Sequence, residues 1–150
     1  MEFDMKNQWT KNADAIMKYA MEQNRSGKPF PIFFTCLGFQ LAAYLTSNYD
    51  NSVLSRVHGD DAIVLPLDLT GKESYLMKTF TETQISNMTK GHGLMYYNHN
   101  WAVTVTTFNQ NSRLKSFWDL IATTTTPYNE DFVAMMEAKD YPFFGVQFHP

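Results

Sequence analysis

A dense apolar run that ends abruptly in a helical pattern is the feature that most constrains this fold. Residues 30–34, Phe-Pro-Ile-Phe-Phe, are short and aromatic, which is typical of a strand buried on both faces. From Leu37 onward the apolar residues recur at helical spacing as far as Ser47. The chain is therefore predicted to change from strand to helix at residues 35–38, and its single cysteine, Cys36, lies at that change.

Cys36 at such a turn has the setting of a nucleophile. A residue on a sharp strand-to-helix turn projects into a cleft, and the free N–H groups and dipole of the helix favour a thiolate. The backbone N–H of Leu37 would face the oxygen of a bound carbonyl and stabilise a tetrahedral intermediate, while Gly38 lets the helix begin close to the strand. The alternative, which residue type alone favours, is that a lone cysteine among apolar neighbours is a small buried hydrophobe.

His149 is the candidate partner of this cysteine. It closes the strand-like stretch 144–148, and open α/β sheets place their reactive groups at the C-terminal ends of strands. A neutral imidazole there could accept the thiol proton and later donate it to a leaving amine. The alternative is an ordinary loop histidine, since a histidine that precedes a proline is more often one.

Length and charge indicate one domain, residues 1–150, that acts on a small or peptide-like ligand. Twelve Lys and Arg against fifteen Asp and Glu give a net charge of −3, which argues against nucleic acid or an anionic membrane surface as the partner. The longest apolar runs, such as 30–34 and 62–67, are far shorter than the roughly 20 residues that span a bilayer.

A single cysteine excludes an internal disulfide framework and any site built from several thiolates. Residues 1–12 are polar and charged and lack the apolar core of a signal peptide.

The remaining pattern predicts an α/β domain. The expected elements are a helix at about 5–25, strands at 53–57 and 62–69, a short helix toward Phe80 opened by a capping box at 70–73, a hairpin of 93–97 and 101–108 around 98–100, a short helix capped by Ser112, and strands at 121–126, 132–137 and 143–148.

Two motifs, residues 30–40 and residues 141–150, together resemble the class I glutamine amidotransferase superfamily. Within it they are most similar to the gamma-glutamyl hydrolases, the folate poly-gamma-glutamate peptidases. Supporting similarity lies in residues 62–71, 98–101 and 113–126, so the resemblance covers nearly the whole chain from the first helix onward.

The resemblance implies a three-layer α/β/α sandwich in which Cys36 is the nucleophile and His149 the general base and acid. It also places His99 near the bound substrate, whereas spacing alone favours a polar hairpin residue there. The implied substrates are gamma-linked glutamyl peptides, above all folylpoly-gamma-glutamates, cleaved through a thioester that water resolves. The resemblance implies that this reaction uses no metal and no cofactor. The implied location is the lysosome, the vacuole or the extracellular space, and a homodimer is allowed.

Three departures from the family pattern shape the expectations. Phe34 stands where the family has a glycine, and we expect its bulk to crowd the tight turn. The family's N-terminal strand with its Gly-rich loop, and the acidic residue after its His-Pro pair, have no counterpart here, so we expect a domain truncated at both ends. Two alternatives stay open: a glutaminase domain that passes ammonia to a synthetase, and an inactive member that keeps a ligand groove or a dimer surface.

Overall fold

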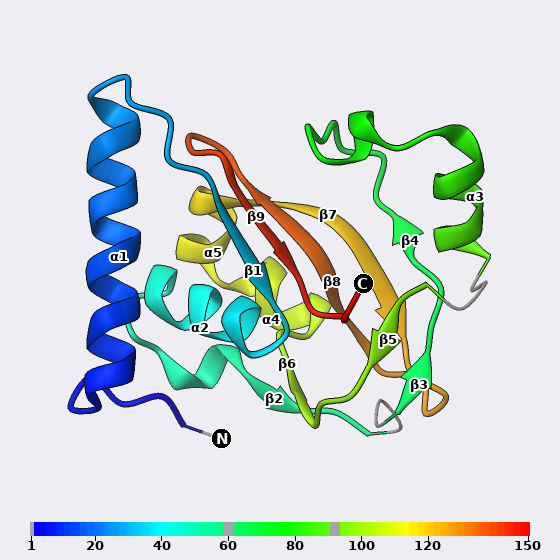
Figure 1. Cartoon of the computed structure of the whole chain (residues 1–150). Coiled ribbons are helices and arrows are strands. Elements are labelled where there is room, and N and C mark those ends of the chain that lie inside the picture. Colours follow the sequence, from blue (N-terminus) through cyan, green and yellow to red (C-terminus); the bar gives the residue numbers. More distant parts are fainter. Residues whose placement is uncertain (1, 59–61, 91–93) are drawn as a thin grey trace.

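The computed structural model describes residues 2–58, 62–90 and 94–150 (Figure 1). Its elements, in chain order, are α1 (Gln8–Arg25), β1 (Ile32–Thr35), α2 (Leu37–Thr46), the 3-10 helix η1 (Asn51–Val53), β2 (Ser55–Arg56), β3 (Ile63–Val64), β4 (Asp68–Leu69), the 3-10 helix η2 (Met77–Thr79), α3 (Glu82–Thr89), β5 (Tyr96–Tyr97), β6 (Trp101–Ala102), α4 (Val105–Gln110), α5 (Ser112–Phe117), β7 (Trp118–Thr125), β8 (Asp131–Ala138) and β9 (Phe143–Val146).

A mixed five-stranded sheet organises the domain, in the order β1-β9-β8-β7-β4. β1 and β9 run parallel, with Ile32 opposite Phe143 and Thr35 opposite Val146, and every other pair in the sheet is antiparallel. The three strands predicted in the last third of the chain are confirmed as β7, β8 and β9. The parallel pair brings the ends of β1 and β9 to one edge of the sheet.

Each face of the sheet carries its own hydrophobic core, so the domain has three layers. One core joins α1, α2, α4 and α5 to the sheet through side chains such as Phe39, Leu114 and Trp118. The other lies under α3 and the short strands β3 and β5, around Met95, Tyr97 and other apolar residues. Figure 1 shows the four helices gathered on one side and α3 on the other. The structure thus confirms the predicted α/β class, with an outer layer of short elements beside α3.

The helix predicted at about 5–25 is confirmed as α1. The Asn7 side chain caps α1 by accepting from the Trp9 N–H, and Gly27 follows the helix with φ of 77°. Trp9 and Ile16 are 45% and 56% exposed, because α1 contacts the domain over a narrower stripe that includes Met17. Within the described residues no helix is both long and apolar enough to cross a membrane.

The predicted change from strand to helix is confirmed, whereas burial of the strand on both faces is wrong. β1 forms one edge of the sheet, so Phe33 is 50% exposed while Ile32 and Phe34 pack against the helical layer. The Phe34 ring lies edge-on to Trp118 and Phe143 at centroid distances of 6.2 and 6.3 Å. Its bulk is therefore taken up by the core below the turn.

The predicted hairpin around residues 98–100 is wrong. β5 pairs with β3 and β6 pairs with β2, so the two strands turn away from each other. The stretch that follows becomes α4, because the Thr104 side chain accepts from the Thr107 N–H and caps a helix. Residue 93, where the hairpin was expected to begin, lies outside the described residues.

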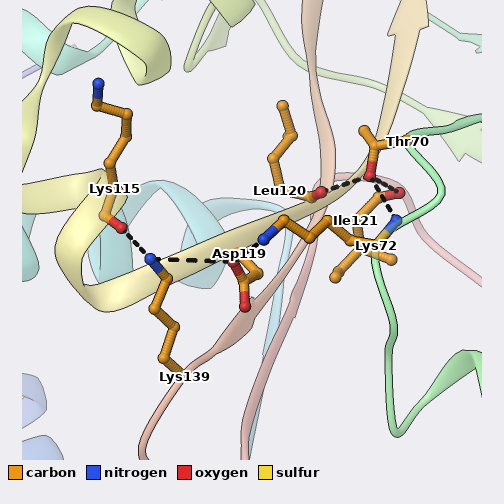
Figure 2. Close-up of polar contacts among 7 residues, drawn as sticks. All are labelled: Thr70, Lys72, Lys115, Asp119, Leu120, Ile121 and Lys139. Carbon is orange, nitrogen blue, oxygen red and sulfur yellow. Dashed lines mark hydrogen bonds and ion pairs between the residues drawn. The ribbon is translucent and has the colours of Figure 1, made fainter.

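The predicted capping box at 70–73 is also wrong, because the Thr70 hydroxyl donates to the Leu120 carbonyl at 2.7 Å (Figure 2). The capping box forms at Thr81 and Gln84 instead and opens α3.

Three further boundaries differ from the predictions. The strand expected at 62–69 divides into β3 and β4, which pair with different partners, β5 and β7. Of the strand expected at 53–57, only β2 is extended, after η1. Asn111 rather than Ser112 caps α5.

We predict that Gly145→Ala destabilises the domain. A Cβ atom at Gly145 would lie 2.9 Å from Cδ2 of Phe39 and 3.3 Å from Cγ of Met136. Both side chains are buried, so neither can yield freely. Overpacking of this kind typically costs about 1–3 kcal/mol of unfolding free energy, which urea denaturation would measure.

Gly38→Ala is the matched control. The nearest atom to its new Cβ would be Cβ of Phe34 at 4.0 Å, an ordinary contact. Because Gly38 lies inside α2, alanine should leave the unfolding free energy unchanged or raise it by up to about 1 kcal/mol. Equal losses in both variants would contradict the role assigned to the Gly145 contact.

Candidate active site

Cys36 occupies a strained turn between β1 and α2. Its φ is 51° and its ψ is −107°, a conformation that costs a non-glycine residue free energy and that surrounding structure must impose. The Cys36 N–H donates to the Val146 carbonyl at 2.9 Å, and the Cys36 carbonyl accepts from the Gln40 N–H at 3.1 Å. The turn is thus held from the neighbouring strand on one side and from the helix on the other.

Burial dominates the electrostatics of the thiol. Partial burial raises the pKa of Cys36 above its ordinary value, and the backbone N–H of Leu37 lowers it by less. The N–H group at the start of α2 therefore favours the thiolate, as expected, but its effect on the pKa is smaller than the opposite effect of burial. The net shift of the Cys36 pKa therefore favours the protonated thiol over the thiolate.

His149 lies at the same edge of the sheet as Cys36, three residues beyond Val146. Its backbone pairs with Tyr96, with the His149 N–H donating at 2.8 Å and the His149 carbonyl accepting at 3.3 Å. The residue is exposed. Within the described residues no hydrogen bond joins its ring to the Cys36 thiol.

A cavity of about 380 Å³ connects Cys36 with the segment that precedes β6. Its lining is formed by Cys36, Leu37, Gln40 and residues 98–101. His99 belongs to this lining and is buried, with its ring edge-on to Tyr97 and Phe132 at 5.8 and 5.4 Å. Three of the four predicted site residues thus meet in one cavity, and His149 does not line it.

Gln40 is a cavity residue that sequence reasoning did not single out. Its side-chain Nε2 donates to the Trp101 carbonyl at 2.5 Å and to Oε1 of Gln147 at 3.4 Å. The contacts fasten the first turn of α2 to the segment that carries His99 and to the end of β9. The spacing from Cys36 to Gln40, one helical turn, was the available signal.

The cavity contains the elements of acyl-transfer chemistry. It offers a thiol on a tight turn, a backbone N–H beside that thiol, and an imidazole on the facing wall. Among the described residues, no cluster of three or more His, Cys, Asp or Glu side chains could hold a metal ion.

Comparison with known proteins agrees with this description. Gamma-glutamyl hydrolase B of Dictyostelium discoideum is 28% identical over 152 residues, which cover 100% of this chain and 43% of that protein. The gamma-glutamyl hydrolase of Rattus norvegicus is 31% identical over 144 residues, with 95% of this chain and 44% of the relative covered. That of Homo sapiens is 30% identical over 148 residues, with 97% and 45% covered.

The chain spans less than half the length of these curated relatives. The sequence profile described as Glutamine amidotransferase class-I matches residues 6–150, which include the Cys36 turn, the 98–101 segment and His149. The chain belongs to the class-I glutamine amidotransferase family.

Proposed function

We propose that this protein hydrolyses gamma-glutamyl peptide bonds with Cys36 as its nucleophile. The observation that carries the proposal is the strained turn that presents the Cys36 thiol to a cavity shared with Leu37 and His99. The names of the relatives, gamma-glutamyl hydrolases, support this reaction over other acyl transfers.

The substrate we propose is a gamma-linked glutamyl chain, in particular a folylpoly-gamma-glutamate. Its gamma-carbonyl would enter the cavity beside Cys36, with its oxygen on the Leu37 N–H and His99 close to the bound chain. The resemblance of the motifs supports this substrate class, and it also implies a lysosomal, vacuolar or extracellular location, which stays a prediction.

In the first half of the reaction Sγ of Cys36 attacks the gamma-carbonyl carbon while its proton passes to the imidazole of His149. The carbon–nitrogen bond then breaks, and the leaving amine takes that proton. In the second half water attacks the thioester carbon, gives a proton to the imidazole, and displaces sulfur, which recovers the proton. The product is the free gamma-carboxylic acid, and Leu37 stabilises the oxyanion in both halves.

His149 must approach the thiol for this sequence to run. In this structure His149 is exposed and forms no hydrogen bond with Cys36 among the described residues, and catalytic hydrogen bonds often tighten only when substrate is bound. The raised pKa of the thiol makes the base essential, because a protonated thiol is a poor nucleophile.

Two observations also favour a second candidate function, a domain that binds gamma-glutamyl ligands without cleaving them. They are the raised pKa of the Cys36 thiol and the lack of a hydrogen bond between that thiol and His149 in the described residues. A partly buried thiol of raised pKa that forms no hydrogen bond with an imidazole in the described residues is what an inactive family member would keep. Activity measurements on the variants below separate the two candidates.

We predict that Cys36→Ser abolishes release of glutamate from pteroylpentaglutamate. Loss of a catalytic nucleophile typically lowers kcat by more than about 1,000-fold, and liberated glutamate measured by chromatography would show it. Equal turnover by Cys36→Ser and the unaltered protein would remove Cys36 from the mechanism. Ammonia released from free glutamine, without cleavage of the glutamyl chain, would indicate a glutaminase instead.

His149→Ala should lower kcat by about 100-fold or more, as expected for a general base. His58→Ala is the matched control, because that imidazole is exposed and pairs with Glu130 at 3.3 Å. The candidate function of binding without cleavage would be favoured by a different result. In that case both variants would bind the substrate as tightly as the original protein, and the original protein would show no turnover.

We predict that Cys36 reacts with iodoacetamide as a thiol of raised pKa. Burial makes the thiolate more costly than in water, so the thiolate fraction, and with it the alkylation rate, rises only at higher pH. The midpoint of the rate against pH should exceed the ordinary value of about 8.5. A midpoint below that value, measured by mass spectrometry in the ligand-free protein, would overturn the dominance of burial.

A further inference from the structure

A second cavity lies at the opposite end of the parallel strand pair from Cys36. It has a volume of about 400 Å³ and is lined by Tyr75, the 137–142 segment and Phe144. These residues surround the start of β9, whereas Cys36 follows the end of β1. The two cavities share no lining residue, so this one is separate from the candidate active site.

Glu137 is the unusual residue of this cavity. It is 6% exposed, and its Oε1 accepts from the Tyr75 N–H at 2.9 Å. Its Oε2 is buried and has no hydrogen-bond partner among the described residues. A buried carboxylate oxygen without a partner costs substantial free energy, so the site lacks a hydrogen-bond donor.

Lys139 lines this cavity, but its ammonium group and that of Lys72 contact groups other than Glu137. Figure 2 shows Lys72 and Lys139 converging on Asp119, at 3.2 and 3.9 Å, and Lys139 also donates to the Lys115 carbonyl. Asp119 lies opposite Glu137 in the β7–β8 register, where like charges repel. The ammonium groups of both lysines therefore pair with Asp119. Glu137 forms no ion pair with any residue that the structure describes.

Two other cations near the cavity lie over aromatic rings. Arg25 is 5.5 Å from the ring centroid of Tyr141, and Lys78 is 5.7 Å from that of Tyr75. Within the described ranges neither is close enough to Glu137 for an ion pair. The cavity thus combines aromatic walls with an unneutralised carboxylate, and this combination recognises organic cations.

We propose that this cavity binds a small organic cation, a primary ammonium group carried on an aromatic or apolar body. The ammonium group donates to Oε2 of Glu137, and the carboxylate of Asp140, which lines the same cavity, adds negative potential. The body lies against Tyr141 and Phe144, which are half-buried, and against Tyr75, which is 78% exposed. The volume is in the range of small-molecule sites, and the mostly apolar lining suits an organic cation better than a hydrated metal ion.

The experiment titrates the whole chain with 2-phenylethylamine and, separately, with 2-phenylethanol, a neutral analogue of the same shape. Calorimetry at pH 7 should show the amine binding at least about tenfold more tightly, because only the ammonium group satisfies the buried carboxylate. Glu137→Gln should weaken amine binding about tenfold to a hundredfold while its side-chain oxygen still accepts from the Tyr75 N–H. Asp140→Asn should cause a smaller loss.

Glu73→Gln is the matched control, since the Glu73 side chain is 90% exposed and should not affect binding. A second readout does not depend on any variant folding: in the unaltered protein the Tyr75 amide resonance should shift with the amine and not with the alcohol. Equal binding of amine and alcohol, undiminished binding by folded Glu137→Gln, or no binding at millimolar amine would each overturn the proposal.

Discussion

The parallel pairing of β1 with β9 is the constraint on which the candidate active site depends. Its last hydrogen bond, from the Cys36 N–H to the Val146 carbonyl, extends the pairing beyond Thr35 and forces the chain into the turn with φ of 51°. Because parallel strands end at one edge, the residues after β9 arrive at that same edge. The position of Cys36 and the approach of His149 are therefore two consequences of one strand pair.

Close packing beneath the turn sets where α2 begins. Phe39 is fully buried, and its ring approaches the Gly145 backbone so closely that a Cβ atom there would lie 2.9 Å from its Cδ2. At the far end of α2 the Trp118 Nε1 donates to the Thr46 hydroxyl at 2.8 Å. The helix is thus held against β9 at its start and β7 at its end, and its first residue, Leu37, lines the cavity.

The elements that local sequence patterns determine were predictable. The change of period at Cys36, the helix around Met17 and the three late strands follow from spacing and residue type alone. The hairpin around His99 failed because both of its strands find partners distant in sequence, which no local signal encodes. Burial in the folded domain likewise decides that the Cys36 pKa is raised rather than lowered. The lack of a hydrogen-bond donor to Oε2 of Glu137 becomes visible only when β7 and β8 are paired.

The segment that carries His99 links the two histidines mechanically. Tyr96 exchanges both backbone hydrogen bonds with His149, and Trp101 accepts from the Gln40 side chain. His99 therefore lies on a span that is tied to the end of β9 on one side and to the first turn of α2 on the other. A movement that brings His149 toward the Cys36 thiol must either break the Tyr96 pairing or carry that span along. In the second case the approach of His149 to the thiol and the repositioning of the His99 segment are a single motion, so a change at one end of the span reaches the cavity at the other.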